Sequence, residues 1–108
     1  MDRGEVFLAP FTYADLQGSK RRPVCIVSST DFNFGADVIA AMVTSSRRRL
    51  DAPTTGDVIL NDWQEAGLLR PSVVRAGRLL VVEAPLLSSR LGVLSARDLA
   101  AVDSGLKK

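Results

Sequence analysis

A continuous apolar run at residues 24–27, entered through Pro23, constrains the fold of this chain most strongly. A strand that is apolar at every position is typically buried on both faces, so we expect it near the centre of a sheet. Pro23 has no N–H to donate, which fits the entrance of a strand and no deeper position. We therefore predict a strand over residues 22–29, with the cationic residues before the proline at its entrance.

Other short apolar runs, each bounded by proline, glycine or polar residues, indicate further strands. The connections carry turn residues, except that Ser95 predicts the start of a helix with Asp98 as its capping-box partner. We predict a single mostly β, α+β domain over residues 1–108, with six or seven short strands and a C-terminal helix. The expected strands are 4–10, 37–45, 57–60, 72–75, 79–83 and 91–94; the expected connections are a long loop at 11–20, turns at 47–56, one helical turn or a wide turn at 61–67, and a turn or bulge at 76–78.

Charge and composition exclude several functions. The chain has 14 Lys and Arg, 12 Asp and Glu, no His and one Cys. Without His, neither a histidine-pair nuclease nor a Ser-His-Asp hydrolase can be built. With a single Cys25 between Val24 and Ile26, we expect an inert buried thiol, no disulfide, and no metal or cofactor.

The apolar runs are all shorter than the roughly 18 residues of a membrane span, and residues 1–5 are polar, unlike a signal peptide. We therefore expect a cytoplasmic protein that does not enter the membrane. Its cations cluster at residues 20–22 and 47–49. Each cluster alone is typical of a solvated loop, and they gain meaning only if the fold brings them together.

Six segments, in order and spanning nearly the whole chain, resemble the MazF/PemK toxin family: Gly4-Glu5-Val6, Pro10-Phe11, and residues 18–23, 40–45, 67–75 and 91–95. The resemblance implies a small SH3-like barrel of antiparallel strands, shared with the gyrase poison CcdB and assembled as a homodimer. It also implies a ribosome-independent endoribonuclease that cuts single-stranded RNA at short sequences without metal. The implied partner is a MazE-like antitoxin whose acidic tail occupies the RNA groove.

Two residues match the family's catalytic pair: Arg22, in the Arg-Pro signature, and Thr44, at the end of the third predicted strand. Ser45 is an auxiliary candidate, although alternation along a strand would point it away from Thr44. Arg75 resembles an arginine of the PemK branch. That branch also uses a carboxylate two residues later, where this chain has Gly77, and a histidine that is absent here.

The chemistry assigns Arg22 a defined role. A guanidinium stays charged and can donate two hydrogen bonds to a phosphate, so Arg22 would stabilise charge on the scissile phosphate and could protonate the leaving oxygen. Thr44 could donate one more hydrogen bond. A guanidinium is a poor base, and the sequence does not identify the proton acceptor. The alternatives are Asp15, Glu5, the phosphate itself, or water.

Cations and aromatic side chains are the expected RNA contacts, because phosphates need cations and unpaired bases stack on rings. The predicted phosphate contacts are Lys20, Arg21, Arg47, Arg48 and Arg49, and the predicted stacking residues are Phe11, Tyr13 and Phe34, each of which could instead fill the core.

Two functions other than a nuclease remain open. One is a gyrase poison on the same fold. The other is a non-catalytic binding module or decayed toxin, which the glycine at position 77 keeps open.

Overall fold

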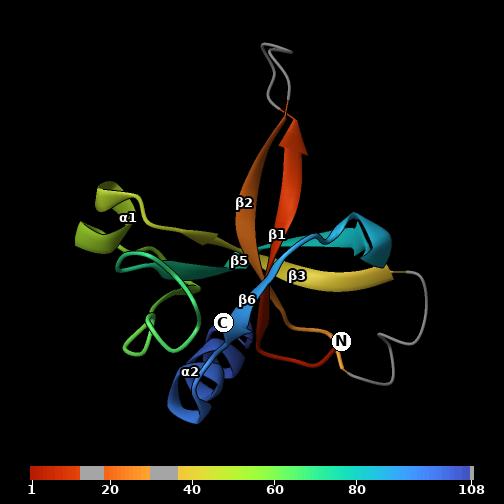
Figure 1. Ribbon diagram of the computed structural model, residues 1–108. Coiled ribbons are helices and arrows are strands. Elements are labelled where there is room, and N and C mark those ends of the chain that lie inside the picture. Colours follow the sequence, from red (N-terminus) through yellow and green to blue (C-terminus); the bar gives the residue numbers. More distant parts are fainter. Residues whose placement is uncertain (13–18, 30–36, 108) are drawn as a thin grey trace.

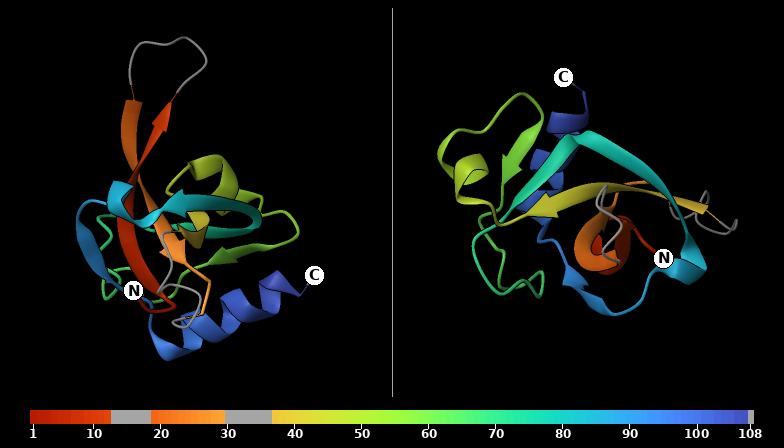
Figure 2. Two further views of the ribbon diagram at one scale, coloured as in Figure 1. Left: turned by 90° about the vertical axis from the view of Figure 1, so that its right-hand side faces the viewer. Right: turned by 90° about the horizontal axis from the view of Figure 1, so that it is seen from above.

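Six antiparallel strands and a C-terminal helix make up the fold in the computed structural model, which describes residues 1–12, 19–29 and 37–107. The strands form one sheet in the order β4-β5-β3-β2-β1-β6. The sheet curls on itself, with the β1–β2 pair standing across β3 and β5 and with α2 at one end (Figure 1, Figure 2). This confirms the predicted small, mostly β barrel. The elements are β1 (Glu5–Thr12), β2 (Ser19–Ile26), β3 (Asp37–Thr44), α1 (Arg47–Asp51), β4 (Asp57–Ile59), β5 (Val73–Glu83), the 3₁₀ turn η2 (Ala84–Leu86), β6 (Arg90–Val93) and α2 (Ala96–Leu106).

The predicted central strand is confirmed, because β2 lies between β1 and β3 and is buried on both faces. Val24 and Ile26 join a core cluster on one face of the sheet. Cys25 points to the other face, where it joins a second cluster that includes Val102 of α2. Because these four side chains are 0% exposed, the two faces of β2 tie both halves of the core together.

The hairpin of β1 and β2 is longer than predicted. Its pairing continues to Thr12 opposite Ser19, so residues 11–12 and 19–20 belong to strands and not to the predicted loop. The prediction that Pro23 could only begin a strand was wrong, since it lies inside β2. The reason is that β3 pairs with β2 from Val24 onward, so at Pro23 the strand has β1 as its only paired neighbour and can lack a donor on the other side.

The two strands predicted at residues 72–75 and 79–83 are one strand, β5. Its partner in β3 changes from Met42, opposite Arg75, to Ala41, opposite Leu79, so residues 76–78 form a bulge. Of the two predicted alternatives at this point, the bulge is therefore correct. A bulge bends a strand without ending it, which helps the sheet to curl.

One connection differs from expectation, and another takes one of its two predicted forms. Residues 47–49, predicted to enter a turn, begin the short helix α1. The segment 61–67 is a wide turn that ends at Gly67, whose φ is +80°. A Cβ at Gly67 would lie 2.0 Å from the carbonyl oxygen of Leu91, so glycine lets this turn pack directly on β6.

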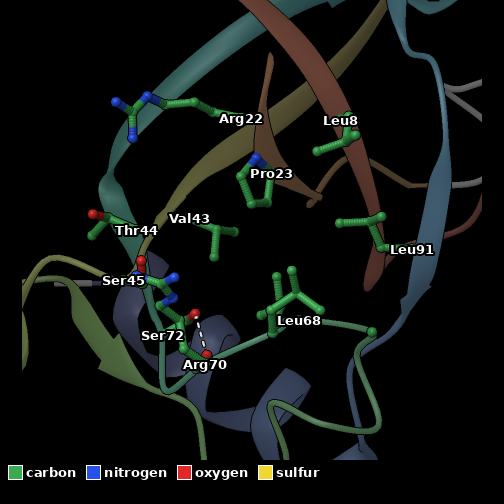
Figure 3. Close-up of a pocket in the computed structure, with 12 residues that line it drawn as sticks. Leu8, Arg22, Pro23, Val43, Thr44, Ser45, Leu68, Arg70, Ser72 and Leu91 are labelled. Atoms are coloured by element: carbon green, nitrogen blue, oxygen red, sulfur yellow. Dashed lines mark hydrogen bonds between the residues drawn. The ribbon is translucent and has the colours of Figure 1, made fainter. Parts of the chain in front are cut away.

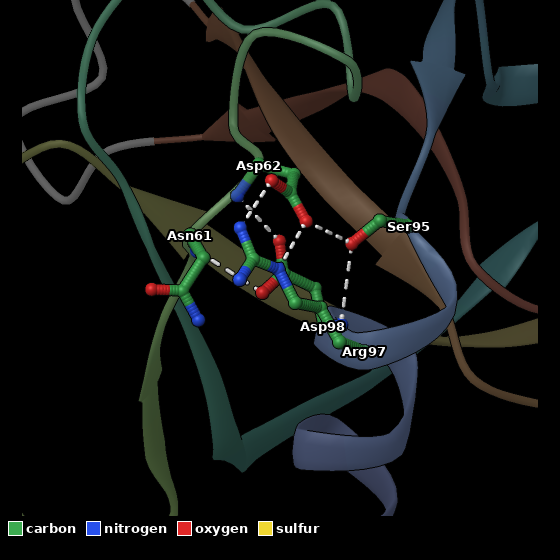
Figure 4. A network of polar contacts seen from close by, with 5 residues as sticks. All are labelled: Asn61, Asp62, Ser95, Arg97 and Asp98. Atoms are coloured by element: carbon green, nitrogen blue, oxygen red, sulfur yellow. Dashed lines mark hydrogen bonds and ion pairs between the residues drawn. The ribbon is translucent and has the colours of Figure 1, made fainter.

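A buried carboxylate ties α2 to the beginning of the segment 61–72 (Figure 4). Ser95 caps the helix as predicted, since its Oγ accepts a hydrogen bond from the Asp98 amide at 3.3 Å. Among the hydrogen bonds described for it, the Asp98 carboxylate does not complete a capping box. It accepts from the amides of Asn61 at 3.0 Å and Asp62 at 2.8 Å instead, and it is 0% exposed.

Asp62 strengthens the same connection. Its carboxylate accepts two hydrogen bonds from Arg97, each 2.7 Å long, and one of 2.5 Å from Ser95 Oγ. The hydrogen bonds from Arg97 and then Ser95 lower the pKa of Asp62 to about 2. The first residues of α2 therefore hold the segment that, as described next, forms one wall of a pocket.

Candidate active site

A pocket of about 360 Å³ opens where the middle of β2 and the end of β3 meet the segment 67–72 and β6. Its two sides differ in chemistry (Figure 3). Leu8, Leu68 and Leu91 form an apolar side, and Arg22 and Thr44 lie on the polar side. The residues that line the pocket are Leu8, Arg22, Pro23, Val43, Thr44, Ser45, Gly67, Leu68, Leu69, Arg70, Ser72 and Leu91.

The strand register brings the two predicted catalytic residues together. The pairing of β2 with β3 reaches Val24 opposite Met42, and Arg22 and Thr44 each lie two residues beyond this pair, where both line the pocket. Pro23 restricts the backbone of Arg22 to extended conformations, which suits its position inside a strand. The exposed guanidinium of Arg22 and the half-buried Thr44 thus share one rim of the pocket.

The hydroxyl of Thr44 is held in place locally. Its Oγ1 accepts a hydrogen bond of 3.1 Å from the Ser46 amide, and a hydroxyl that accepts in this way still has its own proton to donate. Strand β3 ends at Thr44, so the alternation that would have pointed Ser45 away no longer applies. Ser45 lines the same pocket as Thr44.

Arg70 and Ser72 are pocket residues that the sequence analysis did not identify as part of a site. Ser72 is 3% exposed, and its hydroxyl donates a 2.8 Å hydrogen bond to the carbonyl oxygen of Arg70. A sequence signal was available, because Arg70-Pro71 repeats the Arg22-Pro23 dipeptide. The sequence analysis used this segment only for the family resemblance and for the start of a strand at residue 72, and only the fold brings it beside β2 and β3.

Arg75, the auxiliary candidate, does not line this pocket. Its Nε lies 3.2 Å from Oδ1 of Asp57, and the two side chains are 18% and 2% exposed. Burial alone would raise the pKa of Asp57, but hydrogen bonds from Thr54 and Arg75 lower it below the ordinary value. Arg75 therefore joins β5 to β4 in this structure.

The cationic run 47–49 lies on α1, beside the pocket. A second hollow of about 450 Å³ is lined by Arg47 and Leu50 together with Ser45 and Arg70, which also line the first pocket. Arg47 forms an exposed ion pair of 3.6 Å with Asp51. The run 20–22 supplies Arg22 to the candidate site, and Ser45 and Arg70 connect the run 47–49 to the same site.

The structure describes only some of the other residues that were predicted to contact RNA. Arg21 is exposed in β2, next to Arg22, and Lys20 belongs to the same strand. Tyr13, Asp15 and Phe34 lie outside the described residues.

The surroundings of Glu5, a candidate proton acceptor, and of Cys25, the expected inert thiol, bear on these two predictions. Glu5 does not line the pocket, and its carboxylate accepts a 2.5 Å hydrogen bond from Arg90. Although burial opposes it, this contact and the hydrogen bond from the Asp2 amide lower the pKa of Glu5. Burial raises the pKa of the Cys25 thiol to about 12, which matches the inert thiol that we expected.

In the part of the chain that is described, no three His, Cys, Asp or Glu side chains come together as metal ligands would. None of the helices within the described ranges has the length and apolar character needed to span a bilayer.

Several solved structures with the same fold are MazF-type toxins. An endoribonuclease in complex with its cognate antitoxin from a mycobacterial species superposes with a TM-score of 0.79 at 21% identity, over 98% of this chain and 90% of that one. Toxin MazF-mt6 of Mycobacterium tuberculosis gives a TM-score of 0.74 at 22% identity, over 94% and 91%. A MazE–MazF structure from Deinococcus radiodurans gives 0.75 at 25% identity, over 98% and 92%.

The family is shown by the sequence itself. Residues 2–108 match the family described as PemK-like, MazF-like toxins of type II toxin–antitoxin systems. The chain therefore belongs to the MazF/PemK family, whose members are known as endoribonucleases. No curated protein matches it in a sequence comparison.

Proposed function

We propose that this protein is a metal-independent, sequence-specific endoribonuclease that cleaves single-stranded RNA, mRNA foremost, and so inhibits translation as the toxin of a type II toxin–antitoxin system. The observation that carries the proposal is the meeting of Arg22 and Thr44 at the rim of one pocket. Among the described residues that line this pocket none is acidic and two are arginines, so this part of the lining is cationic and suits an anion.

The chemistry follows from the side chains at the rim. Attack of the 2′-oxygen on the neighbouring phosphorus places additional negative charge on the non-bridging oxygens. Arg22 would neutralise that charge with two N–H donors, and the hydroxyl of Thr44 would donate a third hydrogen bond. Departure of the 5′-oxygen then leaves a 2′,3′-cyclic phosphate and a 5′-OH end, and Arg22 could supply the proton that the leaving oxygen takes up.

The surroundings of Glu5 reduce the number of candidates for the group that accepts the proton of the 2′-OH. Because Glu5 is hydrogen-bonded to Arg90 and lies away from the pocket, it is a poor base for this reaction. Asp15, a phosphate oxygen of the substrate and water remain the alternatives. The last two would give slow catalysis, which suits a toxin that has to act only a few times on each message.

The partners are also part of the proposal. An acidic antitoxin tail of the MazE type would compete with RNA for the same cationic rim. The similar structure from a mycobacterial species is that of an endoribonuclease in complex with its cognate antitoxin, which supports an antitoxin partner. A homodimer is supported by apolar side chains on β5 that face solvent in the single chain, Leu79 at 50% and Val81 at 66% exposure. We place the protein in the cytoplasm, where its RNA substrate is.

The proposal is tested by incubating the purified protein with a natural mRNA in excess EDTA and examining the new ends. We expect cleavage at a few sites, with 5′ ends that a polynucleotide kinase labels without prior phosphatase treatment. Cleavage that needs added metal, or that yields 5′-phosphate ends, would contradict the proposed chemistry. A parallel incubation with gyrase and DNA tests the poison alternative, and intact RNA in every lane would favour the non-catalytic module.

A further inference from the structure

The chain contains the Arg-Pro dipeptide twice, as Arg22-Pro23 and Arg70-Pro71, and both arginines line the same pocket. We propose that Arg70 binds the phosphate next to the scissile one, so that the pocket grips two successive phosphates of a single RNA strand. This inference rests on the proposed function, because it assigns a second contact to the same substrate.

The backbone of Arg70 is held firmly enough for this role. Pro71 restricts Arg70 to extended conformations, and the buried Ser72 hydroxyl fixes its carbonyl oxygen at 2.8 Å. Upstream, Gly67 packs against the backbone of Leu91, and Leu68 is 8% exposed. The exposed side chain of Arg70 therefore extends from a fixed segment, which lowers the entropy lost when it binds a ligand.

The charges around Arg70 indicate an anion. Five other arginines form ion pairs with acidic side chains, whereas Arg70 has no ion-pair partner among the residues that the structure describes. Two arginines thus line one pocket, and no carboxylate lines it within residues 1–12, 19–29 and 37–107. Like charges brought together repel each other, and a bound phosphate removes that repulsion while accepting paired hydrogen bonds from a guanidinium.

The two adjoining hollows define the order in which an RNA strand would contact the arginines. Arg70 and Ser45 line both the pocket and the adjoining hollow that contains Arg47. A strand whose scissile phosphate lies at Arg22 and Thr44 would therefore pass Arg70 before it reaches Arg47. Because Arg47 already pairs with Asp51 on an exposed helix, we assign the stronger contact to Arg70.

The test compares Arg70→Ala and Arg70→Lys with a matched control, Arg78→Ala. Arg78 is an exposed arginine that lines neither hollow, so its loss changes the net charge equally. Binding is measured with a random-sequence, single-stranded 2′-O-methyl RNA, which lacks the attacking hydroxyl and still offers phosphates to contacts that do not depend on base sequence. Urea unfolding of each variant checks that the fold is retained.

We expect Arg70→Ala to weaken binding about ten-fold, as for loss of a hydrogen bond to a charged group, and to reduce the slope of log K against log salt by about 0.7. Arg70→Lys should restore the slope but only part of the affinity, because an ammonium lacks the paired donors. In cleavage of a natural mRNA, Arg70→Ala should raise KM more than it lowers kcat.

The outcomes separate the two proposals. If the wild-type protein binds and cleaves RNA but Arg70→Ala behaves like Arg78→Ala in affinity and salt slope, the role of Arg70 is refuted and the proposed function stands. If the wild-type protein neither binds the 2′-O-methyl RNA nor cleaves mRNA, the proposed function fails and the assignment of Arg70 fails with it.

Discussion

Replacement of Asp98 should destabilise the fold out of proportion to the size of the change. The carboxylate is fully buried, and it accepts hydrogen bonds from the amides of Asn61 and Asp62, at 3.0 and 2.8 Å. These bonds anchor the segment that continues into the pocket wall at Leu68 and Arg70. In Asp98→Ala both amides lose their acceptor, and a small cavity replaces the carboxylate.

The magnitude follows from the two contacts. A hydrogen bond to a charged group contributes about 1.5–3 kcal/mol, but the side chain of Asn61 is exposed and water could replace part of what is lost. We therefore expect Asp98→Ala to lower the free energy of unfolding by about 2–4 kcal/mol. Asp98→Asn keeps the volume and one carbonyl oxygen, and its amide nitrogen would face an N–H, so we expect a loss of about 1–3 kcal/mol.

Urea unfolding measured by Trp63 fluorescence provides the assay. Trp63 directly follows Asp62 and packs against the core cluster that contains Val102, so it reports on the anchored segment. All variants should be compared at one protein concentration, because a dimer makes apparent stability depend on concentration. Asp51→Asn, which breaks only the exposed ion pair with Arg47, is the control and should cost at most about 0.5 kcal/mol. A loss for Asp98→Ala no larger than that of the control would refute the reasoning.

Three further outcomes are expected. Thr44→Ala should lower kcat on RNA by about 10²-fold with unchanged stability, and an unaltered rate would remove Thr44 from the mechanism. Because its pKa is low, the ionised Asp62 should stabilise the fold above about pH 4, and this contribution should be lost as the pH falls toward 2. If the urea midpoint of Asp62→Asn fell as much between about pH 4 and pH 2 as that of the wild-type protein, this expectation would be contradicted. With its pKa raised to about 12, Cys25 should react with a disulfide reagent at pH 8 only after unfolding, and rapid labelling of the native protein would show that the thiol is accessible.

Much of the fold could be predicted because burial leaves a local pattern. The apolar residues 24–27 indicated a strand between two others, and Ser95 indicated where the last helix begins. The residues at which strands end, and the way strands pair, could not be predicted from such local patterns. Whether Pro23 lies at the entrance of β2 or inside it depends on how far β3 extends alongside, which is a property of the sheet and not of the proline.

The two residues that we propose as catalytic could be identified where residue type and family resemblance coincide. Arg22 and Thr44 were both identified from the sequence, and they line one pocket. Arg70 was not identified because its place in the pocket depends on a turn that packs on β6 through Gly67, a contact between segments distant in the chain. The carboxylate of Asp98 was assigned to its own helix for a similar reason. The two amides that donate hydrogen bonds to it, those of Asn61 and Asp62, lie 37 and 36 residues earlier in the chain.

The measurement that tests the central claim most directly is kcat/KM for cleavage at one mapped RNA site by wild-type protein, Arg22→Ala and Arg22→Lys, with excess EDTA present. If Arg22 stabilises the charge on the scissile phosphate, Arg22→Ala should lose at least about 10²–10³-fold while its urea midpoint stays near the wild-type value. Arg22→Lys should recover only part of that loss, because one ammonium cannot reproduce the paired donors. A correctly folded Arg22→Ala protein that cleaves at the wild-type rate would contradict the assignment of this pocket as the active site.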